Sequence, residues 1–161
     1  RFPWATTGRT HHRTPNIITS LELDPAEMEK RNIHLQKKYA EIEENEVRFE
    51  ELHCEDAEYL IVAFGSCARI AQKAMEIARE EGIKVGLLRP ITLWPFPSKA
   101  IAARAAQVKG ILTVELNAGQ MVEDVRLAVE CKVPVEHFGR LGGIVPDPDE
   151  VITALKEKLI K

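Results

Sequence analysis

The residues with the greatest capacity for chemistry lie in one stretch of the sequence, residues 111–125. Its first residues are an apolar run of the length and β-branched content of a buried strand, and its last apolar residues recur at helical spacing. Between them lie Glu115, Asn117, Gly119 and Gln120, so the pattern predicts a strand, a tight polar turn and a helix. In an open α/β sheet such a junction lies at the carboxyl ends of the strands, where ligand crevices form. We favour turn and cap chemistry for these polar residues, with Asn117 as a helix cap and Gly119 permitting close backbone approach.

A second candidate is Gly65-Ser66, which follows another apolar run and could bind phosphate at a helix N-terminus. The dinucleotide-binding fingerprint needs three glycines, whereas residues 65–70 contain one, so nucleotide binding is the weaker interpretation. Ser66 lacks the Gly-x-Ser-x-Gly pattern of a nucleophile. Cys67 lies at the predicted start of a helix, where a thiolate would be favoured, although a lone cysteine there is more often a packing residue.

The remaining ionisable candidates are dispersed along the chain. His137 lies near the end of a predicted strand and is the most plausible ionisable group for a cleft, although a lone histidine on an apolar strand is usually structural. His11 and His12 are adjacent in a polar loop and lack the spacing of metal ligands. Three arginines near predicted strand ends could clamp an anion or pair across a subunit interface: Arg69, Arg89 and Arg140. No complete catalytic constellation results, which favours a domain that helps an enzyme without carrying its chemistry.

Strand and helix patterns alternate four times from residue 57 onward. The strands and helices that they predict carry the candidate residues described above. Each apolar run predicts a strand, and each strand is followed by apolar residues at helical spacing. The predicted strands cover residues 59–64, 83–88, 111–114 and 133–138. The last predicted helix follows a capping box at residues 147–150. Such alternation favours a parallel sheet with helices on both faces.

The chain before residue 57 has a different character. Residues 1–20 show no sustained period, and the missing initial methionine suggests a piece of a longer polypeptide. A helix is predicted over residues 24–46, with Asp24 as N-cap, Pro25 at its first position and Glu27 at the capping-box spacing. Its narrow apolar stripe suits a linker between domains. Residues 47–52 alternate apolar and charged, which predicts a half-buried or edge strand.

Composition bounds the class of protein. The chain has 161 residues, 45% hydrophobic and 29% charged, with a net charge of −3 and no basic stripe, so nucleic acid is an unlikely partner. Its three cysteines contain no Cys-x-x-Cys pair, which excludes a zinc ribbon or a ferredoxin-type cluster within the chain and fits a reducing cytoplasm. We find neither a run of 18 apolar residues nor a secretory leader, and therefore expect no membrane crossing.

Four motifs resemble the α subunit of 2-oxoacid:ferredoxin oxidoreductases: Ala63-Phe-Gly-Ser-Cys-Ala-Arg69, Gly86-Leu-Leu-Arg-Pro-Ile-Thr-Leu-Trp-Pro-Phe-Pro97, Val114-Glu-Leu-Asn-Ala-Gly-Gln-Met-Val-Glu-Asp-Val125 and Gly139-Arg-Leu-Gly-Gly143. The resemblance is strong over residues 57–161 and extends through residues 45–51 and the predicted linker helix. The form Leu93-Trp-Pro-Phe-Pro97 is most similar to the branched-chain type, which acts on 2-oxoisovalerate (3-methyl-2-oxobutanoate). The 2-oxoglutarate and pyruvate relatives share much of the pattern.

The resemblance implies a fold like the transketolase C-terminal domain, a three-layer α/β/α arrangement. Its five-stranded, mostly parallel sheet has the order 1-3-2-4-5, and the first strand, here residues 47–52, is antiparallel. The domains implied are an irregular tail of a preceding domain (1–23), a linker helix (24–46) and the α/β domain (47–161). The family converts a 2-oxoacid and coenzyme A to an acyl-CoA and carbon dioxide, with reduction of ferredoxin. The whole complex is expected to use thiamine diphosphate, Mg²⁺ and iron–sulfur clusters.

The resemblance places those cofactors elsewhere. The thiamine diphosphate motif belongs to a partner β subunit, no Gly-Asp-Gly occurs here, and the clusters belong to a ferredoxin-like δ subunit beside a γ subunit. We therefore expect an assembly domain with no catalytic residue, no cofactor and no metal of its own. Alone it should be inactive, and a homodimer is a further arrangement that we consider. Two alternatives stay open. One is a stand-alone nucleotide- or CoA-binding module that uses Gly65, Ser66 and Arg140; the other is the C-terminal domain of a transketolase or 2-oxoacid dehydrogenase β subunit.

Overall fold

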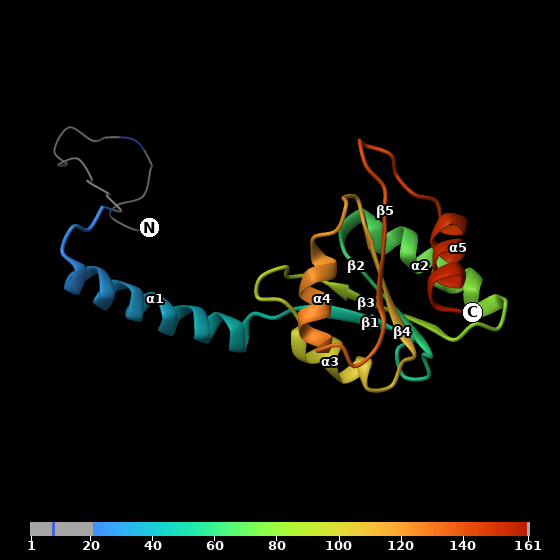
Figure 1. Cartoon of the computed structure of the whole chain (residues 1–161), viewed down its shortest axis with the longest axis horizontal. Helices are drawn as coiled ribbons and strands as arrows, with labels where there is room; N and C mark the ends of the chain where they lie inside the picture. Colours follow the sequence, from blue (N-terminus) through green and yellow to red (C-terminus); the bar gives the residue numbers. More distant parts are fainter. Residues whose placement is uncertain (1–7, 9–20, 161) are drawn as a thin grey trace. The chain divides into compact units, whose positions relative to one another are not determined.

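The computed structural model describes residue 8 and residues 21–160 of the chain. The predicted irregular tail and the pair His11 and His12 lie largely or wholly outside this part. The chain divides into two compact units, residues 1–39 and residues 40–161, and each is considered by itself. Figure 1 identifies the helices and strands by label and colour.

Helix α1 (Pro25–Asn45) confirms the helix predicted over residues 24–46 and continues across the division between the units. Its start is capped as predicted, because Asp24 Oδ1 accepts hydrogen bonds from the backbone N–H groups of Ala26 (2.8 Å) and Glu27 (3.3 Å). None of the residues of α1 is buried. Its stability therefore rests on capping and side-chain pairs such as Lys30–Glu27 rather than on packing.

The second unit is built on one five-stranded sheet with the order β1-β3-β2-β4-β5. Strand β1 is antiparallel to β3, and the other neighbours are parallel. This arrangement confirms the predicted fold. The strands are β1 (Phe49–Leu52), β2 (Tyr59–Ala63), β3 (Val85–Pro90), β4 (Gly110–Glu115) and β5 (Val135–Gly139).

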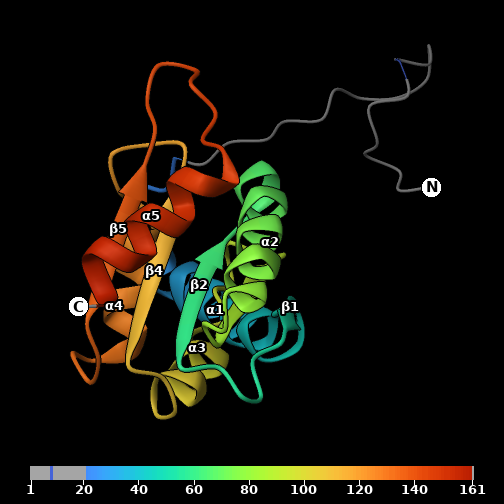
Figure 2. The ribbon, with the colours of Figure 1, turned by 90° about the vertical axis from the view of Figure 1, so that its right-hand side faces the viewer.

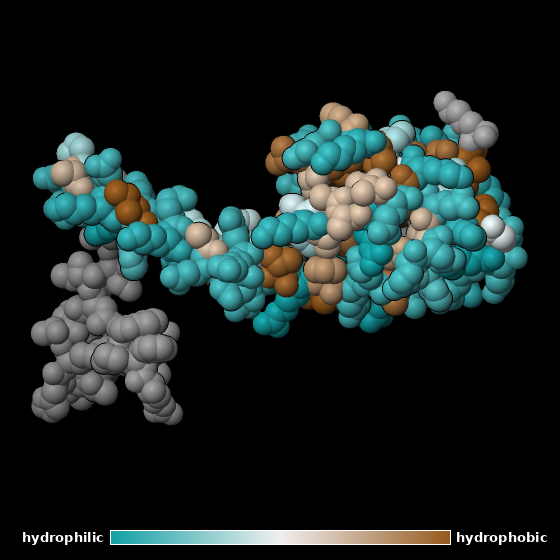
Figure 3. Space-filling model, turned by 90° about the horizontal axis from the view of Figure 1, so that it is seen from below, coloured by the Kyte–Doolittle hydropathy of each residue, from teal (hydrophilic) through white to brown (hydrophobic). Residues whose placement is uncertain are grey.

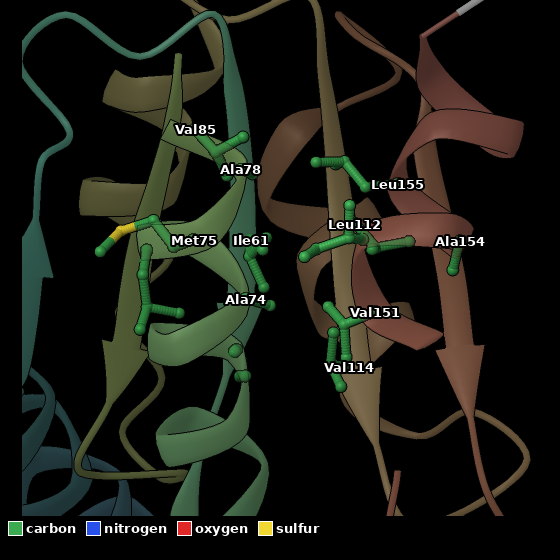
Figure 4. Close-up of a cluster of buried hydrophobic side chains, with 14 of the residues drawn as sticks. Ile61, Ala74, Met75, Ala78, Val85, Leu112, Val114, Val151, Ala154 and Leu155 are labelled. Carbon is green, nitrogen blue, oxygen red and sulfur yellow. The ribbon is translucent and has the colours of Figure 1, made fainter. Parts of the chain in front are cut away.

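Helices cover both faces of the sheet, as predicted. Helices α2 (Gly65–Glu80) and α5 (Pro148–Leu159) lie together on one face, whereas α3 (Ser98–Ala105) and α4 (Met121–Val129) lie on the other, as Figure 2 shows. Each face has its own apolar core. The core under α2 and α5, drawn in Figure 4, contains Ile61, Met75 and Leu112; the opposite core contains Leu60, Ile101 and Val125. The central strands are thus buried on both sides, which explains their continuous apolar runs.

Some element boundaries differ from the prediction for identifiable reasons. Strand β3 continues to Pro90 because its last residues pair with the antiparallel edge strand β1. Strand β5 begins at Val135 rather than at residue 133, and the carbonyl of Pro134 accepts from the N–H of Ile111 at its start. Strand β5 lies at the edge of the sheet, the position expected for a strand next to a proline. Among the described residues, no helix is long and apolar enough to cross a membrane.

Candidate functional site

The junction between β4 and α4 is organised by the carboxylate of Glu115. This last residue of β4 is 1% exposed, and its oxygens accept hydrogen bonds from the N–H groups of Gln120 (3.2 Å), Met121 (2.8 Å) and Val122 (3.0 Å). The first N–H groups of a helix lack partners inside the helix and carry partial positive charge. A buried carboxylate at this place satisfies them and is itself stabilised by them.

The prediction that Asn117 caps this helix is wrong. Helix α4 begins at Met121, and its N-cap position, Gln120, makes no side-chain capping bond. The side chain of Asn117 instead accepts a hydrogen bond from the N–H of Gly119 at 2.7 Å, which closes a local turn. Gly119 has a φ of +113°, a conformation that a residue with a side chain rarely adopts. Asn117 thus shapes the turn, while Glu115 caps the helix from the preceding strand.

His137 completes a polar cluster with Thr113, Glu115 and Asn117. Its Nδ1 lies 3.2 Å from Thr113 Oγ1 and 3.4 Å from Glu115 Oε1, and its Nε2 lies 3.3 Å from the carbonyl oxygen of Asn117. Both ring nitrogens are therefore engaged within the chain. This geometry fits the structural role that a lone histidine on a strand usually has. The neighbouring Gly139 leaves room for the cluster, because a Cβ there would lie 2.2 Å from the oxygen of Asn117.

A small pocket opens beside this cluster, and we call it the switch-point pocket. It has a volume of about 200 Å³ and lies beyond the carboxyl ends of β2, β3 and β4. The chain passes from β2 to β3 on one side and then crosses to β4 on the other side of β2, so the topological switch lies between β2 and β4. The lining residues are Phe64, Leu93, Phe96, Glu115, Gln120, Met121 and Asp124.

The candidates at the start of α2 do not line this pocket. Gly65 has a φ of +56° and begins the helix, and Ser66 is exposed. Cys67 is buried in the core beneath α2. Burial, with a smaller contribution from the charge of Glu115, raises the pKa of the Cys67 thiol. The favoured interpretation of Cys67 as a packing residue is therefore confirmed, and the alternative of a stabilised thiolate at the helix start is not, because the side chain lies in the apolar core.

The three arginines do not form an anion clamp. Arg89 pairs with Glu50 of β1 at 2.7 Å, on one side of the sheet. Arg140 follows β5 on the other side and pairs with Glu150 at 3.2 Å, although its buried Nε has no hydrogen-bond partner among the described residues. Arg69 is exposed on α2. Each cation is thus placed separately, and two of them are already matched by carboxylates.

A larger surface pocket of about 500 Å³ lies along α5. Half of its lining residues are acidic and one is basic, so its net negative charge would repel a phosphate-bearing ligand: Phe138, Asp147, Asp149, Glu150, Thr153, Ala154, Glu157 and Lys158. Within the part of the chain that the structure describes, no group of three or more His, Cys, Asp or Glu side chains could hold a metal ion. The cysteines are unpaired and separate, so these residues do not fit a cluster either.

Comparison with protein families gives the context for this geometry. The family model of the pyruvate:ferredoxin oxidoreductase core domain II matches residues 57–151, more than half of the chain. The chain belongs to this family. The match begins just before β2 and ends in the first turn of α5, so the polar cluster around His137 and the switch-point pocket both lie within domain II.

Curated relatives of this domain II protein are subunits of 2-oxoacid oxidoreductases. Ketoisovalerate oxidoreductase subunit VorB of Methanothermobacter marburgensis is 45% identical over 96% of this chain, and VorB of Methanothermobacter thermautotrophicus is 47% identical over the same share. The chain spans 43% of the length of both relatives. The resemblance found in the sequence is confirmed.

Two solved structures resemble this chain in fold. A 2-oxoglutarate:ferredoxin oxidoreductase from Magnetococcus marinus matches 87% of this chain and 24% of its own, with a TM-score of 0.74 and 26% identity. A split-gene transketolase matches 70% of this chain and 41% of its own with a TM-score of 0.60. At 20% identity the latter shows the fold alone.

Proposed function

We propose that the chain is the C-terminal assembly domain of the α subunit of a 2-oxoacid:ferredoxin oxidoreductase of the 2-oxoisovalerate type. The observation that carries this proposal is the identity of 45% and 47% to two VorB subunits over 96% of the chain. The 2-oxoglutarate synthase subunit KorA of Methanothermobacter marburgensis is 32% identical over 63% of the chain, which favours a branched-chain substrate over 2-oxoglutarate.

The reaction of the whole enzyme would join the acyl group of a 2-oxoacid to coenzyme A, release carbon dioxide and pass two electrons to ferredoxin. Thiamine diphosphate with Mg²⁺, and iron–sulfur clusters, would supply the carbanion and electron-transfer chemistry from partner subunits in the cytoplasm. This chain has no Gly-Asp-Gly and only three dispersed cysteines, so its residues do not fit either group.

The role that we assign to this chain is to hold a contact surface in a fixed shape. The carboxylate of Glu115 is fully used by the start of α4, and both nitrogens of His137 are engaged within the domain. Groups already matched inside a fold are suited to fixing a surface rather than to transferring protons. We infer that Glu115, Asn117, Gly119 and Gln120 fix the strand-end turn in the shape that partner subunits contact.

The test uses the complete α subunit, co-expressed with its partner subunits and assayed for CoA-dependent reduction of ferredoxin. We expect faster turnover with 2-oxoisovalerate than with 2-oxoglutarate. A complex that prefers 2-oxoglutarate would overturn the substrate assignment, and an acceptor other than ferredoxin would favour the transketolase or dehydrogenase alternative.

A second measurement separates an assembly domain from a CoA-binding module. The purified chain is titrated calorimetrically with coenzyme A and then with thiamine diphosphate and Mg²⁺, and we expect no heat of binding from either. The acidic lining of the larger pocket and the placement of Arg140 beside Glu150 support this expectation. Stoichiometric CoA binding that is lost in Ser66→Ala or Arg140→Ala would instead make this domain part of a CoA site.

A further inference from the structure

The switch-point pocket carries negative charge and no cation of its own. Two of its lining residues are acidic, Glu115 and Asp124, and none of the lining residues is Lys, Arg or His. Glu115 is already matched by three backbone N–H groups. Asp124 is exposed, and its carboxylate has no hydrogen bond or ion pair within the described residues. The charge that the pocket leaves unmatched is therefore the carboxylate of Asp124.

The start of α4 cannot serve this pocket as an anion site. A phosphate or carboxylate ligand would bind the first N–H groups of a helix, but Glu115 occupies those of α4 with its own oxygens. The volume of the pocket also argues against a small-molecule ligand. At about 200 Å³ the pocket is smaller than the roughly 300–1,000 Å³ of sites for drug-sized ligands and cofactors. It is suited to a single inserted side chain with a positive charge.

The walls fit the apolar stem of such a side chain. Phe64 and Phe96 are half-buried aromatic residues that pack against the core beneath α3 and α4, and Met121 is 4% exposed. Aromatic rings favour a cation near their faces, and a planar guanidinium stacks on them more readily than an ammonium does. The side-chain oxygen of Gln120, on the same lining, can accept a hydrogen bond from the same group.

Exposed apolar side chains lie on the loops beside the pocket. Ile91 is 48% exposed, Leu93 49% and Leu116 46%. Figure 3 shows apolar surface in brown and tan among the hydrophilic teal of the α/β unit. The loop that carries Ile91 and Leu93 is held in place by Thr92, whose Oγ1 accepts from the N–H of Arg48 at 3.0 Å and donates to the carbonyl of Pro95 at 2.8 Å. Exposed apolar side chains that surround a pocket able to receive one anchoring side chain are typical of the centre of an interface.

We propose that the switch-point pocket receives an arginine side chain from a partner subunit of the oxidoreductase, with its guanidinium on Asp124 and its stem between Phe64 and Phe96. The inference rests on the proposed function, because it names the contact by which this domain would join the assembly. It makes Asp124, which the sequence analysis did not single out, the specificity-determining charge of that contact.

The experiment compares two substitutions on the same helical turn in the complete α subunit. Asp124→Asn removes the pocket charge at nearly constant shape. Glu123→Gln removes a charge that is also exposed but does not line the pocket. Affinity for the purified partner subunits is measured by sedimentation or surface binding. We expect Asp124→Asn to weaken assembly by about 30-fold or more, the loss typical of breaking a desolvated charge pair. Glu123→Gln should change the affinity by less than about twofold.

A cross-link adds a readout that does not depend on stability. A photoreactive benzoylphenylalanine at position 93, which lines the pocket and leaves Asp124 in place, should attach to a partner-subunit peptide that contains an arginine, identified by mass spectrometry. Equal affinities of the Asp124→Asn and Glu123→Gln proteins, or a cross-link confined to the α subunit, would overturn the inference while the assembly role stands. Failure of the unsubstituted subunit to assemble would overturn the proposed function as well. Coenzyme A binding that Asp124→Asn abolishes would make the pocket a ligand site instead.

Discussion

At the scale of single residues, Glu115 joins a strand to a helix through one charge. Its carboxylate ends β4 and accepts from three consecutive N–H groups at the start of α4, in a place that is 1% exposed. Hydrogen bonds to a charged group are stronger than neutral ones, and buried donors left without an acceptor are costly. The position of α4, and with it one wall of the switch-point pocket, therefore depends on this side chain.

We expect Glu115→Gln to lower the free energy of unfolding of the chain by about 3 kcal/mol. An amide has only one acceptor oxygen, and its NH₂ group would face N–H donors. Urea unfolding followed by circular dichroism measures the loss. Glu123→Gln, exposed on the same helix, is the control and should cost about 0.5 kcal/mol or less. Equal midpoints for the two proteins would show that the carboxylate contributes little.

The sequence identified this junction, but it did not show which of its residues caps the helix and which shapes the turn. A polar residue after a strand and before an apolar helical pattern predicts a capped turn, and Glu115, Asn117 and Gln120 are indeed brought together there. Asn117 is the better cap by type, because short polar side chains usually cap helices locally. The position of α4 decides against it, since the helix begins four residues later. Thr113 and Asp124 gave no local signal, because their roles depend on β5 and on the loop after β3.

The three cysteines should differ sharply in reactivity. Burial, followed by the charge of Glu51, raises the pKa of Cys54 to about 11, and burial raises that of Cys67, whereas Cys131 is exposed. At pH 8 we expect a disulfide reagent such as DTNB to modify one thiol quickly and the other two only on unfolding. Cys131→Ser should abolish the fast phase. A fast phase that persists in this variant would show that the cores beneath the helices open readily.

At the scale of elements, a forked ion pair ties the edge strand β1 to helix α3. Arg104 donates to the two oxygens of Glu51 at 2.9 and 2.6 Å, and both side chains are about one-fifth exposed. These hydrogen bonds hold the pKa of the Glu51 carboxyl below its ordinary value, against the opposing effect of burial. The neighbouring pair of Glu50 with Arg89 is much more exposed, so it offers an internal comparison.

We expect Glu51→Gln to cost about 1–2 kcal/mol of unfolding free energy at pH 7. A carboxylate whose pKa is lowered by folding stabilises the protein above its unfolded pKa and loses that contribution as pH falls through the folded value. The difference from the unsubstituted chain should therefore shrink as pH falls below about 4.5. Urea unfolding between pH 7 and pH 3 measures it. Glu50→Gln should stay within about 0.5 kcal/mol throughout; a constant cost of Glu51→Gln at all pH values would contradict the ionic explanation.

The elements themselves were largely predictable because the physical signals are local. Continuous apolar runs marked the strands buried on both faces, and Asp147 with Glu150 formed the predicted capping box before α5. The order of the strands in the sheet could not be predicted from local signals. It came from the resemblance to a known family, since periodicity alone does not tell which strands are neighbours. The end of β3 was set too early because pairing with β1, far away in sequence, extends it.

At the scale of the whole molecule, the two units differ in the interactions that can stabilise each of them. Both apolar cores lie in residues 40–161, whereas no residue of α1 is buried. The described part of residues 1–39 therefore lacks the apolar burial that stabilises folded domains. The hypothesis that residues 24–46 form a linker helix assigns this segment to contacts outside the α/β unit, and it makes a prediction for truncated chains.

We expect a chain of residues 40–161 to keep the unfolding free energy of the full chain to within about 0.5 kcal/mol, since it retains both cores and every strand. A chain that begins at residue 53 is the control. It lacks β1, so it loses the pairing along β3, the packing of Leu52 and the partner of Arg104, and it should be less stable by about 3 kcal/mol or more. Urea midpoints and m-values of the three chains measure the differences. A clearly lower midpoint for residues 40–161 would mean that the first 39 residues stabilise the α/β unit, and the linker hypothesis would then be wrong. An equal midpoint would leave the surface of α1 available to the partner subunits that the proposed function requires.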